Sequence, residues 1–152
     1  TYDLKMPEER VVTNFDRRLI TQAVTNLVKN ATEAVESAVQ GGQTEKGRVE
    51  TILRVSAERI DIEVIDNGIG LPKQNRSRLL EPYVTTKGSK GTGLGLAIVQ
   101  KITEQHGGAL SLDDAPQAAD RASGALVRIT IPRHARPTVH PDTDDDRNTG
   151  AP

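Results

Sequence analysis

Asp66 stands at the end of a segment in which apolar and charged residues alternate, residues 59–66. Such alternation is typical of a half-buried strand. Asp66 occupies one of the apolar positions, so its carboxylate should point toward the covered face, where a charge without a hydrogen-bond donor is costly. Gly68 and Gly70 permit positive φ and let the backbone approach a ligand closely. A flat base with an exocyclic amino group would satisfy the carboxylate, although an Asp-Asn-Gly tripeptide alone is more simply a turn.

The spacing of apolar residues predicts a long helix that is capped by Asp16 and ends before Gly41. Asn26 and Asn30 lie one turn apart on this helix. Together with Glu33 they fall along one edge of the apolar stripe. Asparagine is mildly unfavourable inside a helix, so the pair suggests a function, although a solvated helix surface explains it equally well. Their amide oxygens suit Mg²⁺, which prefers oxygen ligands.

Gly91, Gly93 and Gly95 lead into a second predicted helix, residues 94–105. The backbone N–H groups of such a loop, with the N-terminus of the helix, can hold phosphate groups. The sequence has neither the Lys-Ser or Lys-Thr of a P-loop nor the preceding strand of a Rossmann turn. Lys87, just before the glycines, could meet phosphate charge, although a single lysine is more often a surface residue.

Alternating patterns predict the strands that must position these groups, over residues 2–6, 11–13, 48–57, 59–66, 109–112 and 124–131. The first two should be short strands at a sheet edge, and the next two should form a hairpin. Residues 71–90 are a long connection with a short helical stretch near 77–80, and connections of this length are usually functional or disordered. Residues 133–152 are rich in Pro, Asp and Thr, which predicts a disordered tail after a domain of residues 1–132.

Composition excludes several classes of protein. The 152 residues have a net charge of -1, with 20 Lys and Arg against 21 Asp and Glu, so no basic excess suggests a nucleic-acid partner. No apolar run approaches the length that spans a membrane. Cysteine is absent, which removes disulfides, thiolate metal sites and cysteine nucleophiles. The sequence opens without Met, which suggests a piece of a longer protein.

The motifs together resemble the catalytic, ATP-binding domain of bacterial sensor histidine kinases, in the superfamily shared with gyrase and MutL. The resemblance covers residues 3–132. It is carried by an asparagine box, a first glycine box, an F box, a second glycine box and its usual continuation: 26–34 (NLVKNATEA), 66–70 (DNGIG), 81–87 (EPYVTTK), 91–96 (GTGLGL) and 104–108 (EQHGG). In detail the motifs look most like those of nitrogen-regulation kinases of the NtrY and NtrB kind.

This resemblance implies a two-layer α/β (α+β) sandwich, the Bergerat fold, with a mixed, mostly antiparallel sheet covered on one face by helices. ATP would bind between the two long helices under a mobile lid formed by residues 71–90. Asp66 would accept from the adenine amino group, Gly70 would approach the base, and Asn30 with Asn26 would hold Mg²⁺. The implied catalytic residues are Asn26, Asn30 and Lys87. The implied nucleotide-binding residues are Asn30, Asp66, Gly68, Gly70, Thr86, Lys87, Gly91, Thr92, Gly93, Leu94 and Gly95.

The resemblance also implies a partner. Kinases of this family phosphorylate a histidine of a separate dimerisation domain, normally followed by an acidic residue, and the phosphate then reaches a response regulator. His106, His134 and His140 precede Gly, Ala and Pro, so none fits; His106 is better interpreted as a structural residue at a helix end. We therefore expect this chain to be a monomeric, cytoplasmic catalytic domain. Its acceptor domain is expected in another part of the parent protein, which could be membrane-anchored.

Three alternatives stay open on the sequence. A regulatory module could bind nucleotide without chemistry. An ATP-hydrolysing relative is disfavoured, because such members carry a glutamate general base at the position of Asn26 and an amide cannot abstract a proton. A serine kinase would share the fold, and acid-stable phosphorylation of its product would distinguish it.

Overall fold

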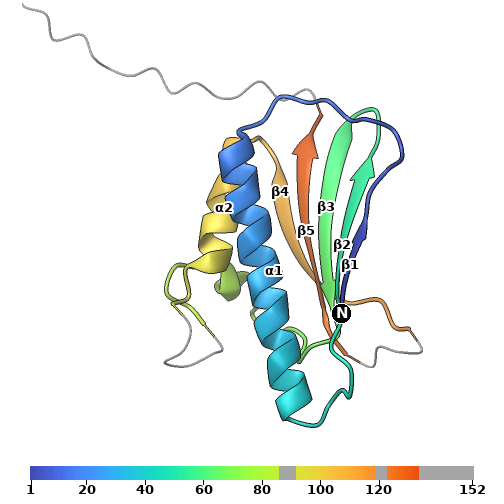
Figure 1. The fold of residues 1–152 in the computed structure, drawn as a ribbon. Helices are drawn as coiled ribbons and strands as arrows, with labels where there is room; N and C mark the ends of the chain where they lie inside the picture. Colours follow the sequence, from blue (N-terminus) through green and yellow to red (C-terminus); the bar gives the residue numbers. More distant parts are fainter. Residues whose placement is uncertain (86–91, 119–122, 134–152) are drawn as a thin grey trace, which may run out of the picture.

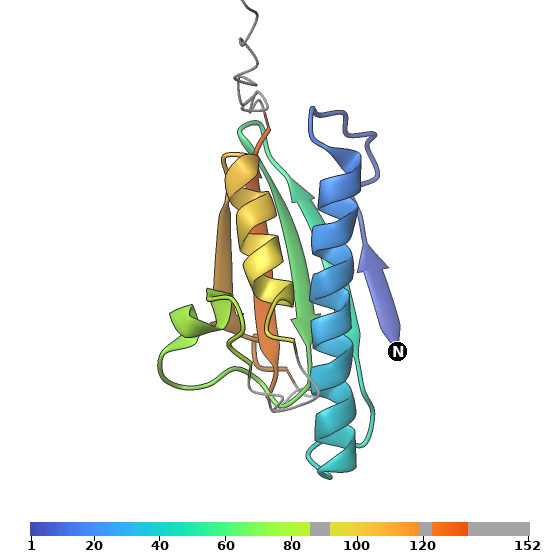
Figure 2. The same cartoon turned by 90° about the vertical axis from the view of Figure 1, so that its left-hand side faces the viewer.

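The computed structural model describes residues 1–85, 92–118 and 123–133. Its elements in chain order are β1 (Tyr2–Lys5), α1 (Arg17–Gln40), β2 (Val49–Val55), β3 (Arg59–Asp66), the 3-10 helix η1 (Arg76–Leu80), α2 (Gly95–Gln105), β4 (Ala109–Asp114) and β5 (Ala125–Pro132). Within these ranges the strands form one sheet in the order β1-β2-β3-β5-β4. The pair β1 and β2 is parallel and the other neighbours are antiparallel. Both long helices cover the same face of the sheet, so the predicted two-layer, mixed fold is confirmed (Figures 1 and 2).

The core lies between this helix layer and the sheet. Its buried residues come from both helices and from the alternate positions of the strands: Ile20, Ala23, Leu27, Ala31, Val35, Val49, Val64, Val99, Ile102, Ile129 and Ile131. The strand members share the parity that the sequence pattern predicts for the covered face. Asp66 shares that parity too and is 4% exposed, so it points into the helix layer at the end of β3.

The two helices are joined at one end through His106. Asp16 caps α1 by accepting a hydrogen bond from the Leu19 amide (3.0 Å), and its own amide donates to Nε2 of His106 (3.1 Å). His106 caps α2, and its Nδ1 lies 2.7 Å from the carbonyl of Ile102. With Nε2 accepting, Nδ1 must donate, so the ring is the neutral tautomer with its proton on Nδ1. The predicted structural role of His106 is confirmed.

Replacing His106 with alanine is expected to lower the free energy of unfolding by about 2 kcal/mol, because it removes one buried and one part-buried hydrogen bond and leaves the Asp16 amide without its side-chain acceptor. Urea unfolding followed by circular dichroism measures this. Lys101→Ala, at an exposed position of the same helix, is the matched control and should change stability by less than about 0.5 kcal/mol. Equal stabilities of the two variants would contradict the linking role.

The strand predicted at residues 11–13 is wrong. The chain from Met6 to Asp16 instead passes over the ends of the strands toward the start of α1 (Figure 1). Thr13 donates its Oγ1 hydrogen to the carbonyl of Arg133 (2.8 Å), and Val12 is 71% exposed. Strand propensity is overridden because this path crosses the strand ends and does not run along a sheet edge. By contrast, β1 lies at the predicted edge.

The opposite face of the sheet is closed by ion pairs. Glu63 lies between the guanidinium groups of Arg54 (3.2 Å) and Arg128 (2.9 Å), and Asp61 accepts from Arg59 (3.1 Å) and from Thr130 (2.6 Å). Both carboxylates are less than 10% exposed and have hydrogen-bond partners. The same face also has a small buried apolar cluster, Ile52, Ile65 and Leu126, against which Ala115 packs.

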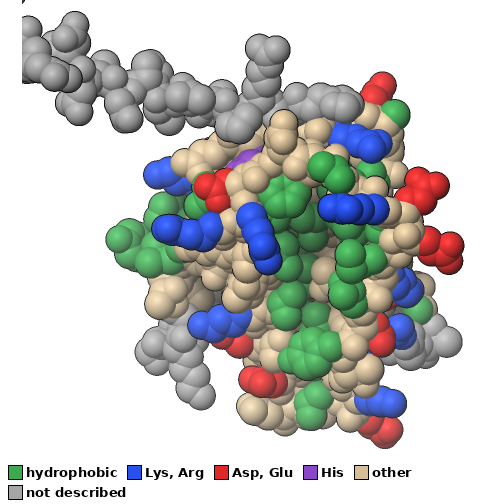
Figure 3. Space-filling view, turned by 45° about the horizontal axis from the view of Figure 1, so that its top comes forward, with side chains coloured by type: hydrophobic (Ala, Val, Ile, Leu, Met, Phe, Trp, Pro, Cys, Tyr) green, Lys and Arg blue, Asp and Glu red, His purple; other side chains and the backbone are tan. Residues whose placement is uncertain are grey.

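Seen from the top, the molecule has a strip of hydrophobic side chains flanked by Lys and Arg (Figure 3).

The remaining predicted segments are found in part. The short helical stretch near residues 77–80 is confirmed as η1, and both helices begin and end within one or two residues of the predicted positions. The strand β5 ends at Pro132. The predicted tail, apart from Arg133, lies outside the described residues.

Candidate nucleotide-binding site

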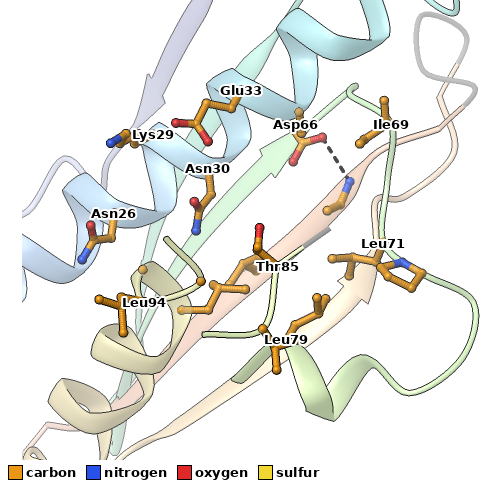
Figure 4. A pocket seen from close by; sticks show the side chains of 18 of the residues that line it. Asn26, Lys29, Asn30, Glu33, Asp66, Ile69, Leu71, Leu79, Thr85 and Leu94 are labelled. Carbon is orange, nitrogen blue, oxygen red and sulfur yellow. Dashed lines mark hydrogen bonds between the residues drawn. The ribbon is translucent and has the colours of Figure 1, made fainter. Parts of the chain in front are cut away.

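A cavity of about 370 Å³ lies between α1, the start of α2 and the end of β3. Its polar wall comes mainly from α1, and its apolar wall comes from β5, from α2 and from the connection after Asp66 (Figure 4). The lining residues are Asn26, Lys29, Asn30, Glu33, Ala34, Ser37, Asp66, Ile69, Gly70, Leu71, Pro72, Leu79, Val84, Thr85, Thr92, Gly93, Leu94, Gly95, Leu96, Ile98, Ala125 and Val127. An apolar cleft with a few convergent polar groups is the usual form of a small-molecule site.

The cavity unites most of the residues that the sequence predicts for the site. The predicted residues that line it are Asn26, Asn30, Asp66, Gly70, Thr92, Gly93, Leu94 and Gly95. Gly68 does not line it. Thr86, Lys87 and Gly91 lie outside the described residues.

Asp66 is held in place by backbone donors. Its Oδ1 accepts from the amide of Gly68 (2.8 Å) and from the amide of Ala125 (3.3 Å) at the start of β5. These bonds orient a buried carboxylate at the wall of the cavity (Figure 4). The close approach of β5 depends on Gly124, because a Cβ there would lie 1.9 Å from the carbonyl oxygen of Asp66 and its φ is +142°.

The turn after Asp66 packs directly on α1, which corrects one expectation. Gly68 does not have positive φ, and its close approach is to the helix rather than to a ligand. A Cβ on Gly68 would lie 2.5 Å from the carbonyl carbon of Ala34, and the amide of Ile69 donates to the Ala34 carbonyl (3.2 Å). Gly70 has φ +76° and lines the cavity. Gly68 therefore fixes the distance between Asp66 and α1.

Asn67, in the same turn, forms hydrogen bonds to the loop before β2. It is 5% exposed, its Oδ1 accepts from the Arg48 amide (2.7 Å), and its Nδ2 donates to the Lys46 carbonyl (2.8 Å). Its backbone amide donates to the Arg48 carbonyl (3.2 Å). One side chain thus ties the loop before β2 to the end of β3.

Asn67→Ala is expected to reduce the free energy of unfolding by about 2 kcal/mol, because the Arg48 amide and the Lys46 carbonyl lose their part-buried side-chain partner. Chemical denaturation measures the loss. Asn14→Ala, at an exposed asparagine before α1, is the matched control and should leave the midpoint nearly unchanged. A wild-type midpoint for Asn67→Ala would show that the loop is held by other contacts.

At the other end of the cavity, Asn30 faces the beginning of α2. A Cβ built on Gly95 would lie 3.4 Å from Nδ2 and 3.6 Å from Oδ1 of Asn30. The first backbone N–H groups of a helix lack partners within the helix, so this end of α2 offers donors and positive potential to an anion. Asn26 and Asn30 project from α1 toward the same region (Figure 4).

The backbone at Gly93, in the described part of the glycine loop, packs against Tyr83. The amide of Tyr83 donates to the Gly93 carbonyl (2.9 Å), and a Cβ on Gly93 would lie 2.5 Å from the carbonyl carbon of Tyr83. Gly93 has φ +67°, which favours glycine. Tyr83 also has φ +67° and is 78% exposed, so a non-glycine residue is kept in the left-handed region here.

Several lining residues were not predicted as site residues. The helix pattern places Glu33 beside Asn26 and Asn30 but gives it no role. Lys29 follows Asn26 by three residues and Ser37 follows Glu33 by four, so the same helical spacing could have found them. Leu71, Leu79, Ala125 and Val127 give no local signal, since they join the cavity only through tertiary packing.

The donor set determines which metal could bind. Among the described residues, no cluster of three or more His, Cys, Asp or Glu side chains could hold an ion. The amide oxygens of Asn26 and Asn30 fit Mg²⁺, because this ion commonly keeps several waters and takes only a few ligands from the protein, with the remainder from substrate phosphates.

In the described part of the chain, no helix has the length and apolarity needed to cross a membrane.

Comparison with known proteins shows what this sequence is similar to. Residues 15–135 match the model of the family described as histidine kinase-, DNA gyrase B-, and HSP90-like ATPase. The nitrogen regulation protein NtrY of Azorhizobium caulinodans is 54% identical over 121 residues, which are 77% of this chain and 14% of NtrY. The sensory histidine kinase/phosphatase NtrB of Rhodobacter capsulatus is 36% identical over 138 residues, which are 86% of this chain and 35% of NtrB.

Solved structures give the same result. A structure of the mycobacterial sensor histidine kinase MprB is similar with a TM-score of 0.70 at 27% identity, covering 89% of this chain and 84% of that one. A nucleotide-free catalytic domain of the histidine kinase ThkA has a TM-score of 0.70 at 28% identity, covering 88% and 80%. The chain spans only a small part of its curated relatives, about a seventh of NtrY and a third of NtrB.

Proposed function

Because this chain belongs to the family of histidine kinase-, DNA gyrase B- and HSP90-like ATPases, we propose that it binds ATP with Mg²⁺ and transfers the γ-phosphate to a histidine. That histidine lies on a separate dimerisation and phosphoacceptor domain. The reaction belongs to two-component signalling on the cytoplasmic side of the cell, and a response regulator receives the phosphate afterwards. The catalytic chain itself acts as a monomer.

The observation that carries this proposal is the order of groups along the cavity. A buried carboxylate, Asp66, lies at one end, and the amide of Asn30 lies against the N-terminus of α2 at the other. The carboxylate accepts from a donor such as the exocyclic amino group of adenine, whereas the helix start suits an anion. A molecule with a base at one end and phosphates at the other meets both demands.

In this proposal each residue has a defined task. Asp66 accepts from the adenine amino group and Gly70 lies against the base, while Gly68 acts indirectly by setting the distance to α1. Asn30 and Asn26 hold Mg²⁺, which when bound offsets negative charge on the phosphate oxygens. Lys87 also stabilises charge in the transition state. The phosphates are bound by the glycine loop and the residues next to it, which are Thr86, Lys87, Gly91, Thr92, Gly93, Leu94 and Gly95.

The transfer itself needs little covalent chemistry from this chain. A ring nitrogen of the acceptor histidine forms a bond to the γ-phosphorus, and the bond from that phosphorus to the β,γ-bridging oxygen breaks. ADP leaves with the electron pair, and the imidazole loses its N–H proton to solvent. Asn26 provides no general base for water, so the site favours transfer over hydrolysis.

Incubating this chain with the separately purified acceptor domain of its parent protein and ATP labelled at the γ-phosphate tests the proposal. We expect label on the acceptor, and we expect it to be lost in acid, because phosphohistidine is acid-labile. Replacing the acceptor histidine with alanine is the control and should abolish labelling. Absence of label with the intact acceptor, or label that is stable in acid, would overturn the proposal.

A further inference from the structure

Glu33 is a carboxylate of the cavity wall to which the proposed function gives no task. It lines the cavity from α1 and is partly buried. Its neighbours on the same wall are amides, a lysine and small residues, so it brings the only other carboxylate of the described lining besides Asp66. A carboxylate near bound phosphates is repelled by them unless it meets hydrogen-bond donors or a cation, and its position therefore matters.

The position of Glu33 can be stated relative to the two ends of the cavity. Asn30 marks the phosphate end, because it lies against Gly95 at the start of α2. Ala34 marks the base end, because its carbonyl accepts from Ile69 in the turn that follows Asp66. Glu33 lies between them in the sequence, about 4.5 Å further along the helix axis than Asn30 at 1.5 Å per residue.

The direction of the side chain agrees with this placement. Figure 4 shows Glu33 leaving α1 between the positions of Asn30 and Asp66, with its carboxylate next to Asn30. On the helical wheel Glu33 is turned about 60° from Asn30, on the same side as Lys29, which is exposed. Glu33 thus lies on the solvent side of the cavity, whereas Asp66 is buried.

We propose that Glu33 binds the ribose hydroxyl groups of the nucleotide. In a nucleoside triphosphate the sugar is the part between base and phosphates, and its 2′- and 3′-hydroxyls are adjacent donors. A carboxylate can accept from both at once, and hydrogen bonds to an ionised acceptor are the stronger kind. Glu33 therefore makes the site selective for ribonucleotides; this inference rests on the proposed function, because it requires a nucleotide in the cavity.

The test is a calorimetric titration of the whole chain with ATP and with 2′,3′-dideoxyATP, both in Mg²⁺, for the wild type and for Glu33→Ala. For the wild type we expect the dideoxy nucleotide to bind at least about tenfold more weakly. For Glu33→Ala we expect ATP to weaken to a similar extent and the preference to disappear. Glu36→Ala is the matched control, since Glu36 is an exposed carboxylate of α1 outside the cavity, and it should keep the full preference.

Each result decides between the proposals. Equal wild-type affinity for the two nucleotides, or a preference that persists in Glu33→Ala, would overturn the ribose role and leave ATP binding intact. If Glu33→Ala lost the Mg²⁺ dependence of ATP binding but kept the preference for the ribose sugar, the ribose role would also be overturned, and Glu33 would be a metal ligand. A wild type that binds neither nucleotide would overturn the proposed function itself and the ribose role with it.

Discussion

Asp66→Asn is expected to weaken ATP binding by about 100-fold, a loss typical of a buried, charge-assisted hydrogen bond that becomes a clash of two donors. Asp66 Oδ1 already accepts from the amides of Gly68 and Ala125. Asparagine can keep those two bonds only by using its one oxygen for them. Its NH₂ group then faces the adenine amino group, so donor meets donor. Calorimetric titration with ATP in Mg²⁺ measures the change.

A second nucleotide makes this prediction sharper. Inosine triphosphate has a carbonyl oxygen where ATP has the exocyclic amino group, so the wild type should prefer ATP and Asp66→Asn should lose or reverse that preference. Asp61→Asn is the matched control, because Asp61 is a buried carboxylate of the same strand on the opposite face. An unchanged preference for ATP in Asp66→Asn would show that the base is recognised elsewhere.

Asn30→Ala is expected to lower phosphotransfer to the acceptor domain by about 1000-fold, since groups that stabilise charge on a transferring phosphate typically contribute factors of 100 to 1000 or more. The substitution removes the amide that lies against the start of α2. Affinity for ATP in the presence of EDTA should change little, whereas the increase in affinity on adding Mg²⁺ should disappear. Labelled-phosphate transfer and calorimetry with and without Mg²⁺ measure the two effects.

Gln22→Ala is the control for this loss, because Gln22 is an exposed amide of the same helix outside the cavity. It should transfer phosphate at the wild-type rate. Retention of the Mg²⁺ effect in Asn30→Ala would remove Asn30 from the metal site and leave Asn26 as the remaining amide ligand.

The features that were predicted correctly depend on local sequence. Asp16 and Gly41 set the ends of α1 because capping involves only neighbouring residues. The period of β3 placed Asp66 on the covered face, since a strand alternates strictly between its two faces. The same helical spacing that joined Asn26 and Asn30 also brings Glu33 into the cavity.

The features that were not predicted depend on tertiary packing. Nothing near Gly124 indicates that it must pass within contact distance of Asp66, because that contact exists only when β5 pairs with β3. Gly68 was expected to approach a ligand, but it approaches the backbone of α1 at Ala34. A glycine signals that some group comes close, and its sequence context does not say which one.

The central claim is that this cavity binds Mg-ATP, and calorimetric titration of the chain with a non-hydrolysable ATP analogue tests it most directly. With Mg²⁺ present we expect saturable binding at one site per chain, and with EDTA we expect weaker binding at the same site. Binding should also raise the unfolding temperature, and the rise should grow with the logarithm of ligand concentration once that concentration exceeds the dissociation constant. Absence of heat of binding and of any shift in unfolding temperature, in both buffers, would contradict the account.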